Sequence, residues 1–203
     1  MDFVVVVSFL FFMSIFAGVG LASIRVKKDT TDDYLVAGRG MSPSLAALSA
    51  VSTWNSGYMF IGFIGFTYTR GYTVGFLAFM STIGQVVAWA WLYKFIQKEG
   101  RERGVRSLSS LVAEKAGAPE AKLAGILSVL FLSVYAAAQL TSGGKALFVM
   151  MGWPEIIGIL IGFVLVVACC YAGGIRASIW TDAAQSCVMI VGSTILCWIS
   201  LQE

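Results

Sequence analysis

Long apolar stretches alternate with short polar segments along the whole chain. Six of these stretches approach the roughly 20 residues that an α-helix needs to cross about 30 Å of hydrocarbon. They cover approximately residues 3–24, 45–68, 72–95, 123–149, 156–172 and 178–201. The pattern predicts an all-α integral membrane protein with six transmembrane helices.

A run of polar residues interrupts the second apolar stretch. Residues 52–57 read Ser-Thr-Trp-Asn-Ser-Gly, and Asn55 is the only asparagine in the chain. In hydrocarbon every backbone N–H and C=O needs a partner, so polar side chains and glycine at mid-span favour a broken helix whose carbonyls face a cavity. In secondary transporters such broken helices hold the coupling ion and the substrate. The run therefore predicts a binding site.

Asp182 is the only acidic residue well inside a predicted span. An intramembrane carboxylate is costly and usually faces a cavity or a partner. Thr181, Gln185 and Ser186 fall near it at helical spacing, so much of this polar surface can share one side of a helix. The sequence is compatible with a cation site here and also with an anchor at the inner membrane interface, one turn into the span.

The fourth stretch carries polar residues at intervals of three or four. Such a stripe is typical of a water-accessible path, and equally of hydrogen bonds between helices. In the fifth stretch Gly158 and Gly162 form a pair of small residues that favours close helix packing. The residues of the polar stripe are Tyr135, Gln139, Ser142 and Lys145.

Composition narrows the class further. Hydrophobic residues make up 58% and charged residues 12% of the chain, whereas soluble domains have about 25% charged residues. The chain has no histidine, and its four cysteines lie in apolar runs without metal-ligand spacing. We find no credible nucleophile–base pair or metal cluster, so we expect neither an enzyme nor a resident cofactor, and nothing suggests a nucleic-acid partner.

The basic residues predict an orientation. If the N-terminus lies outside the cell, twelve of the fourteen basic residues fall in the inner loops or their flanks, leaving only Arg70 and Lys145 outside. This distribution satisfies the positive-inside rule. We expect a multi-pass protein of the cell membrane, with a cytoplasmic loop at about 96–121 that is a connector or holds a short amphipathic helix over residues 106–115.

Two separated sequence runs resemble signatures of a known family, the sodium:solute symporters. Residues 32–40 read DDYLVAGRG and are followed by LSA at 48–50. Residues 172–176 read AGGIR and lead to WTDAAQ at 180–185. The order and spacing of the runs fit the family, and the sodium/proline branch is the nearest in pattern.

The resemblance implies a fold and an activity. It implies a LeuT-like transporter with two inverted five-helix repeats, of which this chain matches a leading helix at about 3–24 and the first repeat at about 45–201. The expectation is that residues 1–203 form the N-terminal portion of such a carrier, with the second repeat absent. The implied activity is sodium-coupled symport of a small organic solute such as a proline-like amino acid.

The resemblance also implies functional residues. It places a sodium ion against the backbone carbonyls of Ser52 and Asn55, and Asp182 matches a carboxylate implicated in sodium binding or passage. Arg39 matches a basic residue near the inner gate. Substrate contacts map to Ser56, Gly57, Tyr58, Gly62 and Tyr135.

One departure bears on the solute. Proline carriers have an acidic residue where this chain has Trp54, so sodium coupling and solute choice can differ here. An alternative to transport is a sensor, in which the same membrane module feeds a signalling domain outside this chain. The pattern leaves the oligomeric state open.

Overall fold

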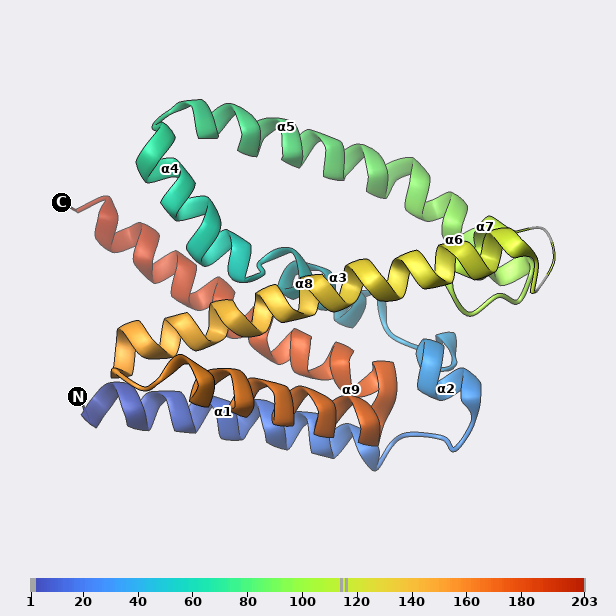
Figure 1. The fold of residues 1–203 in the computed structure, drawn as a ribbon, viewed down its shortest axis with the longest axis horizontal. Coiled ribbons are helices and arrows are strands. Elements are labelled where there is room, and N and C mark those ends of the chain that lie inside the picture. The colour runs from blue at the N-terminus through green and yellow to red at the C-terminus, as the bar shows by residue number, and fades with distance from the viewer. Residues whose placement is uncertain (1–2, 114, 116, 203) are drawn as a thin grey trace. The chain divides into compact units, whose positions relative to one another are not determined.

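The computed structural model describes residues 3–113, 115 and 117–202, and these residues form helices without strands (Figure 1). The helices of this described part, in chain order, are α1 (Phe3–Ile24), α2 (Thr31–Val36), the short 3₁₀ helix η1 (Ala37–Arg39), α3 (Pro43–Trp54), the π-helical η2 (Tyr58–Phe63), α4 (Ile64–Arg70), α5 (Thr73–Val87), the π-helical η3 (Ala88–Leu92), α6 (Tyr93–Glu102), α7 (Leu108–Val112), α8 (Pro119–Met151) and α9 (Glu155–Ser200).

The helix lengths confirm an all-α membrane protein, but they confirm only part of the predicted span count. Four described helical stretches are long and apolar enough to cross a membrane: Phe3–Ile24, Thr73–Glu102, Pro119–Met151 and Gly173–Ser200. The predicted fifth span is the shorter apolar helix Glu155–Tyr171. The predicted second span is divided, because α3 ends at Trp54 and helical structure resumes beyond Ser56.

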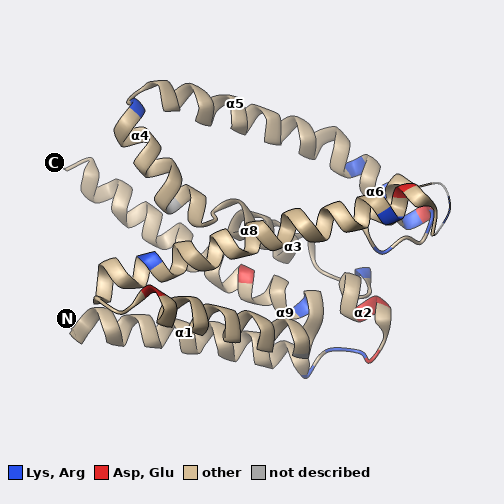
Figure 2. Cartoon of the chain, in the orientation of Figure 1, with Lys and Arg blue, Asp and Glu red and all other residues tan. Residues whose placement is uncertain are grey.

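Charged residues lie mainly outside the long apolar helices (Figure 2). Helix α1 contains none along its length. Many charges gather instead around α2 and around α6 and α7. Large apolar side chains on α5 such as Phe76 and Phe79 are exposed, which suits helices whose surroundings are lipid.

The chain forms two compact units, and the first contains Met1–Tyr58 and Gln139–Glu203. Within it α9 bends sharply at Gly174, where the backbone has φ 59° and ψ −150°. Helix α1 packs closely on α9 through small residues. A Cβ built at Gly20 would lie 2.9 Å from the Cys169 sulfur and 3.3 Å from the Thr181 methyl, so this approach depends on glycine.

The predicted packing role of Gly158 is confirmed in the same unit. A Cβ built at Gly158 would lie 2.8 Å from the Cα of Gly144 on α8, and one built at Gly144 would lie 2.7 Å from the Glu155 carbonyl oxygen. Glycines on both helices therefore allow α8 and α9 to meet backbone to backbone.

The second unit contains Met59–Ala138. It holds most of η2, the helices α4 to α7 with η3, and the first part of α8. Gly71, at φ 62°, turns the chain between α4 and α5. At its other end the Arg103 guanidinium donates to the carbonyls of Leu111 and Ala113, which holds α7 against the end of α6. Helix α7 lies inside the interval 106–115 for which the sequence left a connector or a short helix open.

Candidate functional site

The polar run in the second span coincides with a break in the helix. Ser42 caps the start of α3 by accepting a hydrogen bond from the Leu45 N–H at 3.3 Å, and Pro43 occupies the first turn. At the other end Asn55 leaves the helical conformation, with φ −80° and ψ 61°. Its side-chain amide donates to the Val51 carbonyl at 3.1 Å. The single asparagine therefore ends α3, and its side chain adds a second hydrogen bond to the Val51 carbonyl, which also accepts the Asn55 backbone N–H at 3.0 Å.

The two amides after Asn55 do not make the hydrogen bonds of a continuous helix. In a continuous helix the Ser56 N–H would donate to Ser52 and the Gly57 N–H to Thr53. Here the Ser56 N–H donates to the Trp54 carbonyl at 2.9 Å, and the Gly57 N–H donates to the Gln139 side-chain oxygen at 2.8 Å. The Ser56 and Gly57 amides therefore do not donate to the carbonyls of Ser52 and Thr53, as they would in a continuous helix.

Helix α3 is joined to α9 by a row of polar contacts. The Ser49 hydroxyl donates to the Asp182 carboxylate at 2.7 Å, and one turn further the Ser52 hydroxyl donates to the Gln185 side-chain oxygen at 3.4 Å. Ser186, which is fully buried, donates to the Leu48 carbonyl. Asp182 therefore faces α3, the helix that carries the break, and has a hydroxyl partner there.

The residues predicted for sodium all lie in the first unit. Ser52 is buried on α3, Asn55 is half-buried at its end, and Asp182 is half-buried on α9. Asp182 and Ser52 lie along the same α3–α9 contact. Asp182 bonds to Ser49, which is one turn before Ser52 on α3, and Ser52 bonds to Gln185, which is one turn after Asp182 on α9. Whether these residues bind sodium stays a prediction.

The residues predicted for the solute and the gate are divided between the units. Ser56, Gly57 and Tyr58 follow the break in the first unit, whereas Gly62 in η2 and Tyr135 on α8 belong to the second. Arg39 ends η1, where it has a positive φ of 55°. These roles also remain predictions.

Three residues that bond to the site were not predicted as site residues. Ser49 lies three residues before Ser52, so helical spacing alone would place both on one face. Gln185 belonged to the polar surface around Asp182, and Gln139 to the polar stripe of the fourth span. Spacing indicated that these glutamines share helix faces with other polar residues, but it could not indicate which segment they contact.

A second polar cluster joins α2 to the bend of α9. The Arg176 guanidinium donates to both carboxylate oxygens of Asp33 and to the Ala37 carbonyl at 3.2 Å. The Tyr34 hydroxyl donates to the Cys170 carbonyl at 3.2 Å. Asp33 is 3% exposed, so this ion pair is enclosed. These contacts hold α2 and η1 against α9 on both sides of its bend, and we call the segment of α2 and η1 the strap.

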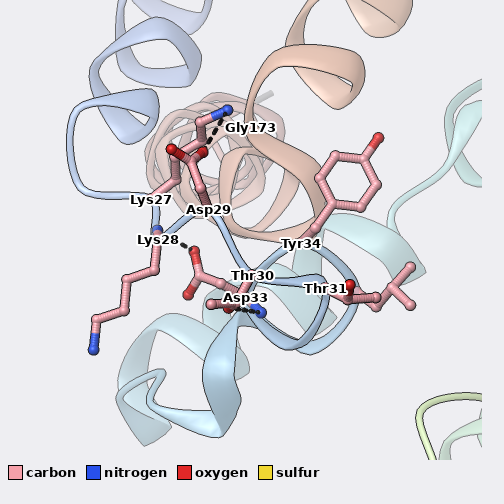
Figure 3. A pocket seen from close by; sticks show the side chains of 9 residues that line it. Lys27, Lys28, Asp29, Thr30, Thr31, Asp33, Tyr34 and Gly173 are labelled. Carbon is pink, nitrogen blue, oxygen red and sulfur yellow. Dashed lines mark hydrogen bonds and ion pairs between the residues drawn. The ribbon is translucent and has the colours of Figure 1, made fainter.

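A cavity of about 360 Å³ lies beside this strap (Figure 3). Among its lining residues, the Lys27 ammonium pairs with Asp29 at 3.5 Å, and the Lys28 backbone N–H donates to the Asp33 carboxylate at 2.8 Å. The lining residues are Lys27, Lys28, Asp29, Thr30, Thr31, Asp33, Tyr34, Leu35 and Gly173.

The ion pair predicts a pH dependence of stability. The hydrogen bond from Arg176, followed by that from the Lys28 N–H, holds the pKa of Asp33 below its ordinary value of 3.8. A carboxylate with a depressed folded pKa stabilises the fold in full above its unfolded pKa, and this stabilisation is lost as the pH falls through the folded pKa. We expect D33N to melt at a lower temperature than wild type from pH 8 to about pH 5, with the difference shrinking below about pH 4.

The measurement is thermal unfolding of the detergent-purified protein across this pH range. D29N is the matched control, because the Asp29 side chain is 92% exposed and exposed ion pairs contribute little. A constant gap between wild type and D33N down to pH 3 would show that the ion pair does not carry the effect.

The apolar helices and the broken span define the class of the chain: an all-α integral membrane protein. The chain belongs to the sodium:solute symporter family, because the model of that family matches residues 34–203.

The relatives of the chain include sodium/glucose cotransporters and proline transporters. A sodium/glucose cotransporter of Vibrio parahaemolyticus is 29% identical, in an alignment that covers 95% of this chain and 35% of that protein. The high-affinity proline transporter PutP of Bacillus subtilis is 28% identical over 77% of this chain and 34% of its own length. The sodium/proline symporter of Escherichia coli is 25% identical over 78% of this chain and 32% of its own length.

These relatives are transporters rather than enzymes, as the sequence predicted. The chain spans about a third of their length. No solved structure matches the chain.

Proposed function

We propose that the protein takes part in sodium-coupled symport of a small organic solute across the cell membrane. The observation that carries this proposal is the break after Trp54 in a member of the sodium:solute symporter family, where the amides of Ser56 and Gly57 donate to Trp54 and Gln139 instead of to the carbonyls of Ser52 and Thr53. In the proposal the chain has its N-terminus outside and contributes six spans to a LeuT-like fold.

Sodium would bind at the C-terminal end of α3. The proposed ligands are the carbonyl oxygens of Ser52 and Asn55, with Asp182 as a nearby negative charge on the sodium path. The C-terminal end of a helix carries a partial negative charge, and in broken-helix transporters such ends coordinate sodium. Sodium binding here would stabilise the unwound segment, which links ion occupancy to the solute contacts that follow it.

The solute would bind beyond the break. Its proposed contacts are taken from the family resemblance, and Arg39 is proposed to act near the inner gate. The relatives transport both proline and glucose by name, so a proline-like amino acid and a sugar are the first two solutes to test. The proposed contacts are Ser56, Gly57, Tyr58, Gly62 and Tyr135.

The sodium gradient supplies enough free energy for accumulation. One sodium ion that crosses a potential of about 100 mV releases about 2.3 kcal/mol. This free energy corresponds to roughly 50-fold accumulation of an uncharged solute.

The full-length gene product should therefore show sodium-dependent uptake. In membrane vesicles we expect at least one solute among proline, other amino acids, short carboxylates and glucose to accumulate under an inward sodium gradient. Replacing sodium by potassium should reduce the initial rate at least about tenfold, since the coupling free energy is then lost. Vesicles without the protein are the control. Equal uptake in the two salts, for a solute that the protein does carry, would contradict sodium coupling.

A further inference from the structure

The Gly57 amide is held by a side chain from another helix. Gly57 begins the helical segment after the break, so its N–H is one of the groups that have no partner within their own helix. Gln139 on α8 accepts this N–H at 2.8 Å. Since the donor is a backbone N–H, the glutamine atom that faces it must be the oxygen. Gln139 thus caps the helix after the break from outside that helix.

The packing around this hydrogen bond is equally close. A Cβ built at Gly57 would lie 2.7 Å from the Ser142 Cβ and 3.1 Å from the Gln139 side-chain oxygen. Real Cβ atoms essentially never approach a neighbour to 2.7 Å. One turn of α8, from Gln139 to Ser142, is therefore fitted against the Gly57 backbone by both a hydrogen bond and direct contact.

We propose that Gln139 is a positioning residue of the proposed sodium site, which keeps the second span unwound by holding the Gly57 N–H away from α3. This inference rests on the proposed function. Within the hydrocarbon, an N–H without a partner is strongly disfavoured. Without the Gln139 oxygen, the nearest way to satisfy the Gly57 N–H is to rewind the helix onto the Thr53 carbonyl.

Rewinding would remove a sodium ligand. A continuous helix at this point also directs the Ser56 N–H to the Ser52 carbonyl, and that carbonyl is the proposed ligand. Sodium then has to compete with a helical hydrogen bond. Gln139 therefore acts on sodium affinity through the backbone, without contacting the ion.

The test compares two variants of similar size in the full-length gene product. Q139M keeps the length of the side chain and removes the strong acceptor, whereas Q139E keeps an acceptor oxygen. We expect Q139M to raise the sodium concentration for half-maximal uptake about tenfold, the scale expected for one lost hydrogen bond. The maximal rate at saturating sodium should change less than about threefold, because abundant sodium still shifts the rewound helix to the unwound, sodium-bound state. For Q139E, the sodium concentration for half-maximal uptake should equal that of wild type or lie below it.

S133A is the matched control on the same helix. The Ser133 hydroxyl is exposed and bonds only to the Val129 carbonyl of its own helix among the contacts described, so this variant should behave as wild type. Equal sodium dependence of Q139M and wild type would overturn the proposal. The proposal would also be overturned if Q139E needed as much sodium for half-maximal uptake as Q139M. The loss of the acceptor oxygen would then not be the cause of the weaker sodium dependence.

A second readout separates this proposal from the proposed function. Hydrogen–deuterium exchange of a peptide covering residues 52–58, without sodium, should differ between Q139M and wild type and return toward wild type in Q139E. If wild type shows no sodium-dependent uptake while this exchange pattern is found, symport fails and the positioning role stands. If uptake depends on sodium and exchange is the same in all variants, the positioning role fails alone.

Discussion

An alanine at position 174 is expected to prevent the accumulation of folded protein. Gly174 has φ 59° and ψ −150°, a backbone region that is essentially restricted to glycine and costs another residue on the order of 1–3 kcal/mol. A Cβ there would also lie 2.5 Å from the Tyr34 carbonyl oxygen. Relief by movement of α2 is blocked, because Asp33 is bonded to Arg176 and the Tyr34 hydroxyl to Cys170.

The combined penalty should exceed about 3 kcal/mol, a large part of the 5–15 kcal/mol that stabilises a typical fold. We expect G174A to give little monodisperse protein in size-exclusion chromatography and to melt well below wild type. G192A is the matched control on the same helix, since a Cβ at Gly192 would meet nothing within 4 Å, and it should melt within a few degrees of wild type. Normal yield and melting of G174A would show that the strap does not fix the bend.

The predictable part of this fold follows from local patterns. The length of the apolar stretches indicated where helices can cross the membrane, because few structures other than a hydrogen-bonded helix satisfy the backbone in hydrocarbon. The polar run from Ser52 to Gly57 indicated a break for the same reason, and the helix indeed stops at Asn55. Even here the pattern did not give the form of the second span, which continues beyond the break as η2 and α4 rather than as one regular helix.

Contacts between distant segments were beyond the reach of these patterns. Asp33 and Arg176 are 143 residues apart, and the sequence placed them in two separate signature runs without pairing them. Gly174 belonged to the AGGIR run, and the sequence alone did not explain why a glycine stands there. Its backbone angles, φ 59° and ψ −150°, explain it. Gln139 lay on a stripe that was compatible with a water path or with interhelical bonds. Only the structure shows that it bonds to the Gly57 backbone.

Replacing Gly57 by alanine is expected to reduce sodium-dependent uptake by a factor of about 5 to 150, the equivalent of the roughly 1–3 kcal/mol that overpacking costs. The new Cβ would lie 2.7 Å from the Ser142 Cβ and 3.0 Å from its hydroxyl oxygen. To make room, the break must move away from α8, which lengthens the hydrogen bond from the Gly57 N–H to Gln139. Initial uptake rates per folded transporter, with the folded amount measured by size-exclusion chromatography, check this result.

The space that alanine needs can be supplied from the other helix. S142G removes two of the three atoms that would lie nearest to the added Cβ, so the double variant G57A/S142G should recover at least about threefold of the lost uptake, a coupling of the size seen between residues in contact. A glycine within α8 costs about 1 kcal/mol of helix stability, so recovery should be partial. G143A is the control, because a Cβ at Gly143 meets nothing within 4 Å. If G57A and the double variant lose uptake equally, the defect does not come from contact with α8, and the close fit between α8 and the break is not what transport requires.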